Sequence, residues 1–121
     1  MSKPYSDNLL LLDAVTVSTT GSLYDVSKRD VKSVQFIASG ITSGNGVFKI
    51  QVSNDGTNWV EYRRLIDSTT TTANLYYGTS TLTTTSSALY LFPQGDYFRN
   101  VRAVCTITTD GTYTAILQAS G

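Results

Sequence analysis

The stretch from Val47 to Val60 constrains the fold more than any other part of this chain. Phe48, Ile50 and Val52 fall on one side of an alternating run, and Val47, Lys49 and Gln51 on the other. This period of two is that of a β-strand with one buried face. An Asp55–Gly56 turn follows, in which glycine can take the left-handed conformation. The stretch therefore predicts a β-hairpin, with a second strand from Trp59 to Ile66.

Similar alternating runs recur along the chain, and no 3.6-residue period persists beyond a turn or two. Ser and Thr supply about a quarter of the residues, and β-branched threonine favours strands. We therefore predict an all-β, single-domain antiparallel β-sandwich or jelly roll of about eight strands, joined mostly by hairpins. Residues 1–8 are predicted to form an N-terminal arm and residues 9–121 the sandwich. The other main strands are predicted at 9–18, 31–39, 88–92, 97–108 and 113–119.

The charges of the chain are few and balanced. Charged residues make up 15% of the sequence, with a formal net charge of +0. A neutral surface provides no field that attracts nucleic acid or an anionic membrane, so neither is expected as a partner. The adjacent Arg63 and Arg64 point to opposite faces of a strand, as do Arg99 and Arg102 in alternation. We expect salt bridges to carboxylates instead, with Glu61, Asp67 and Asp96 as candidate partners.

Several kinds of chemistry are excluded or disfavoured by the residues present. The chain has no histidine, which removes Ser-His-Asp and Cys-His mechanisms and nearly every zinc site. The carboxylates show no spacing that indicates a glycosidase pair. The sole cysteine, Cys105, lies in an apolar run and is predicted to fill the core. We expect no catalytic residue, no cofactor, no metal and no enzymatic activity.

Two features near residue 55 each allow two interpretations. The oxygens of Asn54, Asp55 and Asn58 could bind calcium, but a calcium site needs six to eight oxygens, so a structural turn is favoured. Trp59 could be a core anchor, which we favour. Alternatively, Trp59 and Tyr62 could form a platform on which a sugar ring stacks.

Candidate contact residues lie in the arm and among the tyrosines. The chain has 8 tyrosines, a residue favoured both at core rims and at protein interfaces. The threonine-rich tracts at 69–72 and 83–87 are interpreted as extended surface loops, which commonly carry the contacts of a module. The candidate subunit contacts are Lys3, Pro4, Tyr5, Tyr76 and Tyr77.

A resemblance to a known class of proteins rests on three segments. Residues 46–59, which include Ser53-Asn54-Asp55-Gly56 and Trp59, resemble small virion proteins of tailed bacteriophages. Residues 11–16 and the segment Tyr97–Arg102, followed by Asp110-Gly111-Thr112, are similar to elements that occur in the same order in those proteins. The segment Ser53–Trp59 also resembles discoidin-type carbohydrate-binding modules, which are typically longer. Residues 68–87 match neither class.

The resemblance implies a non-enzymatic structural protein of a phage particle. The role it favours is a capsid decoration (cement) protein or another head or tail accessory subunit. Such proteins are commonly trimers that contact the major capsid protein, partly through terminal arms. The chain is then expected to be made in the host cytoplasm, with no signal peptide or membrane helix, and to reside in the virion. The alternative is a carbohydrate-binding module of a tail fibre or adhesin.

Overall fold

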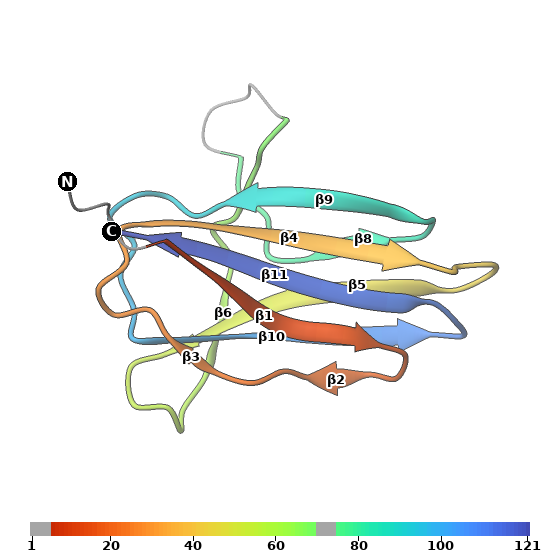
Figure 1. The fold of residues 1–121 in the computed structure, drawn as a ribbon, viewed down its shortest axis with the longest axis horizontal. Coiled ribbons are helices and arrows are strands. Elements are labelled where there is room, and N and C mark those ends of the chain that lie inside the picture. The colour runs from red at the N-terminus through yellow and green to blue at the C-terminus, as the bar shows by residue number, and fades with distance from the viewer. Residues whose placement is uncertain (1–5, 70–74) are drawn as a thin grey trace.

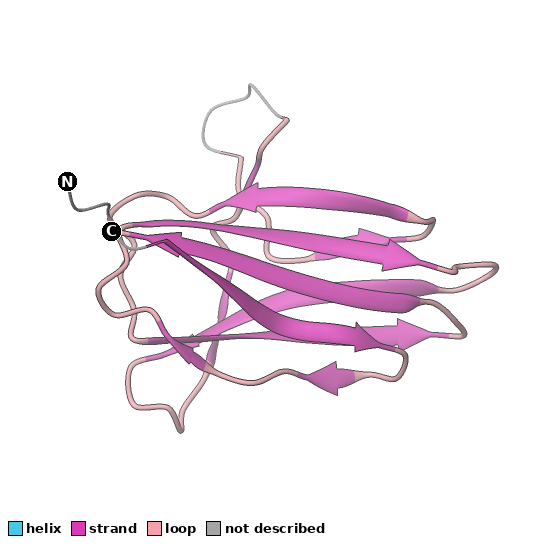
Figure 2. Cartoon of the chain, viewed as in Figure 1, coloured by secondary structure: helices cyan, strands magenta, loops and turns pink. Residues whose placement is uncertain are grey.

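Two antiparallel β-sheets pack face to face in the computed structural model, which describes residues 6–69 and 75–121. The described residues form strands and loops but no helix, as Figure 2 shows. This architecture confirms the predicted all-β sandwich. The strands are β1 (Ser6–Val15), β2 (Thr19–Thr20), β3 (Tyr24–Asp25), β4 (Val31–Ser39), β5 (Asn45–Ser53), β6 (Val60–Tyr62), β7 (Ile66–Asp67), β8 (Ser80–Leu82), β9 (Ser86–Leu91), β10 (Asn100–Thr108) and β11 (Thr112–Ser120).

The strand order differs from a chain of hairpins. One sheet has the order β1-β11-β4-β9-β7, and the other has the order β2-β10-β5-β6, with β3 also on β10 and β8 also on β5 (Figure 1). Only β5 and β6 are both consecutive and paired in the described part of the chain. The Asp110–Gly111 turn carries the chain from one sheet to the other. The expectation of mostly hairpin connections was therefore wrong, because alternation identifies a buried face but not the neighbouring strand.

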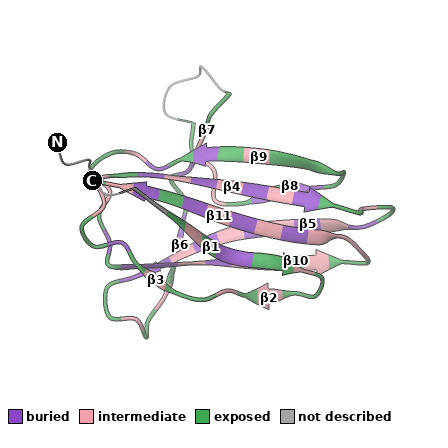
Figure 3. Ribbon diagram, in the orientation of Figure 1, coloured by how far each residue is buried: buried purple, intermediate pink, exposed green. Residues whose placement is uncertain are grey.

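The alternation of apolar and polar residues in the sequence matches the alternation of buried and more exposed side chains in the structure. Along β4, Val34, Phe36 and Ala38 are buried and their neighbours are more exposed, which gives the banding visible in Figure 3. β4 has the predicted bounds, and β5 extends the predicted strand by two residues at its start. In β1, both Leu11 and Leu12 are buried because a register shift between Leu10 and Leu12 interrupts the pairing with β11.

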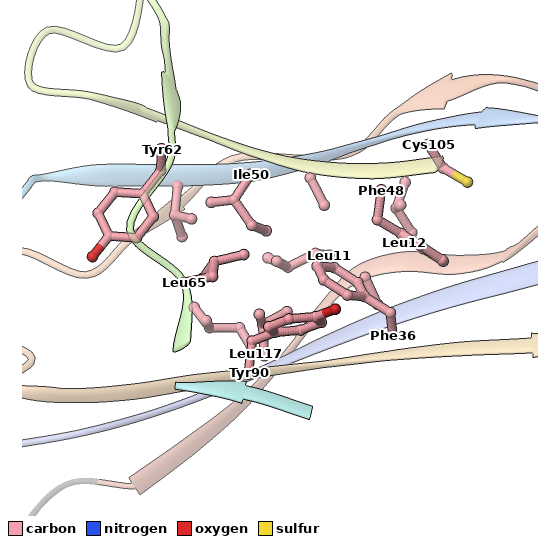
Figure 4. Packing of buried hydrophobic residues seen from close by; sticks show 14 of the residues in the cluster. Leu11, Leu12, Phe36, Phe48, Ile50, Tyr62, Leu65, Tyr90, Cys105 and Leu117 are labelled. Carbon is pink, nitrogen blue, oxygen red and sulfur yellow. The ribbon is translucent and has the colours of Figure 1, made fainter. Parts of the chain in front are cut away.

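The core lies between the sheets and is centred on aromatic rings. Phe36 of β4 stacks on Phe48 of β5 with ring centroids 4.4 Å apart, so each sheet contributes one partner. Tyr90 packs against Phe36 and Tyr113 against Phe48. Figure 4 shows Phe36, Phe48 and Tyr90 between the two sheets, together with Ile50, Leu65 and Leu117. Cys105 is buried in the same cluster, as predicted.

Two predicted boundaries are corrected by the structure. Residues 6–8 belong to β1, where Ser6 pairs with Ser120, and not to an arm. The second threonine-rich tract is not entirely loop, since its last two residues begin β9 and β8 ends directly before it. In β8, Thr81 pairs with Val47 and is exposed, whereas Ser80 and Leu82 on either side of it are buried. Residues 1–5 and 70–74 lie outside the described part of the chain, and with them Lys3, Pro4, Tyr5 and most of the first tract.

Gly46 provides a test of the core packing. A methyl group at this position would overlap the Tyr113 ring, which is fully buried and cannot move aside. We expect Gly46→Ala to lower the free energy of unfolding by about 2 kcal/mol, as overpacking does elsewhere. Equilibrium denaturation in urea measures the change.

The matched control is Gly78→Ala. There the nearest atom to the added methyl is Cγ of Arg63 at 3.1 Å, part of an exposed and flexible side chain. We expect this variant to be neutral or stabilised, within about 1 kcal/mol. Equal destabilisation of the two variants would contradict the proposed clash.

Candidate functional site

An open cleft of about 600 Å³ lies at one end of the sandwich. The Asn54–Asn58 turn forms one side, and the loop from Gly95 to Phe98 forms the other. Both segments lie at the left of Figure 1. The cleft combines exposed apolar groups with amides and an ion pair. Its lining residues are Val52, Ser53, Asn54, Asn58, Val60, Tyr62, Arg64, Gly95, Asp96, Tyr97 and Phe98.

Asp96 is the centre of the polar network in this cleft. Its Oδ2 accepts a hydrogen bond from the Tyr62 hydroxyl at 2.6 Å and another from Nε of Arg64 at 2.7 Å. The hydrogen bond from Arg64 holds the pKa of Asp96 below its ordinary value, against a smaller opposing effect of burial. Burial and the Asp96 carboxylate together raise the pKa of Tyr62. The carboxylate therefore stays charged and the phenol stays neutral at physiological pH.

Lys32 supports this network from inside the protein. Its side chain is buried, and its Nζ donates to the carbonyl oxygens of Arg29 and Asp96, each at 3.1 Å. The same ammonium group lies 5.0 Å from the centre of the Phe98 ring. Burial lowers the pKa of Lys32, and the charges of Asp30 and Asp96 oppose that shift. Sequence reasoning missed Lys32, although it is in phase with Val34 and Phe36 on β4.

The Asn54–Asn58 segment is a structural turn, as favoured. Oδ1 of Asp55 accepts the backbone N–H groups of Thr57 and Asn58 at 2.9 and 2.8 Å, and Oδ2 accepts Nδ2 of Asn58. These hydrogen bonds hold the pKa of Asp55 far below its ordinary value. Gly56 has φ +75°, the left-handed conformation expected there. The described residues contain no group of three or more His, Cys, Asp or Glu side chains placed to hold a metal ion.

Trp59 is not a core anchor, and that interpretation was wrong. Its side chain is half-buried, outside the core, with the Arg102 guanidinium 4.1 Å from the ring centre. Tyr62 is only 7% exposed and faces the core. The two residues are three positions apart, and an odd separation in an extended chain places side chains on opposite faces. Trp59 and Tyr62 therefore do not form the common sugar platform that the sequence suggested.

The structure separates the two tyrosines expected at subunit contacts. Tyr76 is 39% exposed, with the Arg64 guanidinium 4.8 Å from its ring centre. Tyr77 is half-buried and packs edge-on against Tyr90 of the core. Its backbone pairs with Leu65. Tyr76 is thus the one of this pair that presents its ring to the surface.

The arginines make the kind of ion pairs that were expected. Arg63 pairs with Glu61 at 3.1 Å and Arg64 with Asp96 at 2.7 Å. The third candidate carboxylate, Asp67, instead accepts the backbone N–H and the hydroxyl of Thr69. Arg99 lies 3.7 Å from Asp25, a partner that was not anticipated. No helix long and apolar enough to span a membrane occurs in residues 6–69 or 75–121.

Comparison with known proteins identifies a shared fold. The crystal structure of the SPBc2 prophage-derived protein YomS is similar to this chain, with a TM-score of 0.63 and 15% sequence identity. The similarity covers 98% of this chain and 96% of YomS. At this identity the likeness shows the fold alone. No protein-family model matches the chain, and no curated protein matches it either.

The low pKa of Asp55 predicts a pH-dependent contribution to stability. Because the pKa is lower in the folded state, the carboxylate stabilises the fold above its unfolded pKa of about 4, and this contribution is lost as the pH falls. Asp55→Asn should be less stable than wild type at neutral pH. The difference should shrink towards about pH 2, as measured by urea denaturation at each pH. A difference that does not change with pH would contradict this prediction.

The position of Trp59 predicts a modest effect of its removal. Trp59→Ala should cost about 1–2 kcal/mol of unfolding free energy, because it loses the contact with Arg102 and little core packing. Phe48→Ala, which removes a stacked core ring, should cost about 4 kcal/mol. Thermal and denaturant unfolding of both variants measure the gap. A cost for Trp59→Ala equal to that for Phe48→Ala would contradict its placement outside the core.

Proposed function

We propose that this chain is a non-enzymatic structural protein of a phage virion. The role we favour is a capsid decoration protein or another head or tail accessory subunit. The observation that carries the proposal is the match to YomS, a prophage-derived protein, over almost the full length of both chains. The shared part is the whole sandwich.

The chemistry of the cleft supports a role in contacts. Asp96, Tyr62 and Arg64 are hydrogen-bonded to one another, and Lys32 is bonded to backbone carbonyls. Groups that serve as nucleophiles or general bases need a free reactive atom and a pKa matched to that task. The only cysteine has its pKa raised to about 11 by burial, so its thiol is unreactive at physiological pH. These groups hold loops in place.

The proposed partners are the major capsid protein or other virion subunits, together with further copies of this chain. Resemblance to decoration proteins favours a trimer. Such a subunit strengthens a shell by adding buried contact area, without any chemical reaction. The protein would be made in the host cytoplasm and would act in the virion. Of the subunit contacts predicted from the sequence, Tyr76 is the one that lies in the described part of the chain with its ring exposed.

One observation favours carbohydrate binding as a second candidate function. In the cleft, the Tyr97 side chain is 62% exposed beside the amides of Asn54 and Asn58. An exposed ring with neighbouring amides suits a sugar, whose apolar face can stack while its hydroxyl groups bond to the amides. A glycan array with Tyr97→Ala as the control tests this alternative. Binding that does not depend on Tyr97 would argue against the cleft.

Mass spectrometry of purified phage particles tests the virion role. We expect peptides of this chain to co-purify with the major capsid protein at a constant ratio across the particle peak of a density gradient. An abundant cytoplasmic protein of the same lysate is the control and should be depleted at that peak. Absence of this chain from intact particles would overturn the proposed function.

A further inference from the structure

The outer face of the five-stranded sheet is uncharged over four strands. Strand register aligns two rows of outward side chains across β1, β11, β4 and β9. One row is Leu10, Ile116, Gln35 and Leu89. The other row is Asn8, Gln118, Ser33 and Leu91. We call these eight residues the uncharged face.

The charged residues of these strands do not interrupt the uncharged face. Among the described side chains, they are Lys32, which is buried, and Asp13, which lies beyond the register shift in β1. The outer face of the other sheet is different. There, Lys49 pairs with Glu61 at 3.4 Å, and Arg63 and Arg102 are also exposed or half-exposed. The two outer faces of the sandwich therefore differ in kind.

The uncharged face is not flat, because leucine side chains protrude beside a hollow. Leu10, Leu89 and Leu91 are 41%, 41% and 42% exposed, which is high for leucine side chains on a sheet. Next to them is a hollow of about 90 Å³, lined by residues of both rows, among them Gln35 and Ile116. Protruding leucines beside a hollow give a surface that a partner of matching shape can cover closely.

We propose that a second copy of this chain docks on the uncharged face, so that two sandwiches meet face to face about a two-fold axis. This inference rests on the proposed function as a virion subunit, and for the association of that subunit it puts a two-fold dimer in place of the trimer that the resemblance implies. In a two-fold contact the same patch is used on both copies and must be complementary to itself. Asn, Gln and Ser side chains meet that requirement because each both donates and accepts hydrogen bonds.

Charge favours a second copy over other occupants. A charged partner would lose hydration at this face and find no opposite charge in return, at a cost of several kcal/mol per ion. The opposite face of the same chain carries Lys49, Glu61, Arg63 and Arg102, so head-to-tail stacking of sheets meets the same penalty. Of the two outer sheet faces in the described part of the chain, the one that matches the uncharged face in polarity is the uncharged face itself.

The size of the face favours a folded partner over a peptide. The eight residues form the centre of this sheet surface. Over their whole length of roughly 25 Å, and so beyond the two rows, the four strands about 4.8 Å apart give a flat footprint of about 500 Å². Side chains make the accessible area larger than this footprint, which brings it near the roughly 800 Å² per partner of a standard interface. A single extended segment would cover a fraction of the face and leave leucines exposed.

Sedimentation velocity over a concentration series tests the proposal with paired substitutions. We expect the wild-type chain to form a dimer. Gln35→Glu is nearly isosteric and should raise the dimer dissociation constant at least tenfold, because each dimer would then bury two unpaired carboxylates. Leu89→Lys should act in the same direction. Gln51→Glu makes the same change on the other sheet, where Arg102 donates to residue 51, and should leave the dissociation constant unchanged.

Every outcome decides the proposal. Circular dichroism melts first establish that each variant is folded. A monomer at about 100 µM, a concentration well above that needed for a stable interface, would overturn the proposal. A trimer that is insensitive to Gln35→Glu and Leu89→Lys would also overturn it, as would a monomer that binds particles through this face. In these cases particle mass spectrometry could still support the virion role, so the two proposals fail separately.

Discussion

The stacking of Phe36 on Phe48 is the contact on which the rest of the sandwich depends. The rings come from different sheets, and their 4.4 Å separation fixes how closely β4 and β5 approach. Tyr90 and Tyr113 extend the same aromatic layer, and the absence of a side chain at Gly46 makes room for the Tyr113 ring. Because interiors are close-packed, this layer sets which side chains of every other strand fit between the sheets.

Sequence reasoning predicted the strands well where the pattern was local. The alternation in Val31–Ser39 and Val47–Ser53 identified both strands and their buried faces, since period and burial follow from one extended backbone. It could not predict that β10 and β11 lie in different sheets on either side of the Asp110–Gly111 turn. A turn between two alternating runs has the same sequence whether the second strand pairs with the first or crosses to the opposite sheet.

In the candidate site, too, the local contacts were predictable from the sequence and the long-range contacts were not. The turn around Asp55 was predictable, because its hydrogen bonds join residues two or three positions apart. The network at Asp96 was not, because Arg64 is 32 positions away and Lys32 is 64 positions away. The error at Trp59 was avoidable. Trp59 and Tyr62 are separated by three positions, so in an extended strand only one of the two side chains could face the core. That residue is Tyr62, which is buried and lines the cleft together with Arg64, two positions further on.

The central place of β11 has a consequence for how the chain acquires its fold. β11 lies between β1 and β4, so no intermediate without residues 112–120 can join the first strand to the rest of its sheet. β1 therefore stays unpaired in its sheet, with Leu11 and Leu12 unprotected by β11, until residues 112–120 have been synthesised and are free of the ribosome. Proteins built from such distant pairings fold slowly. That interval is when chains of this protein are most prone to aggregate or to need a chaperone.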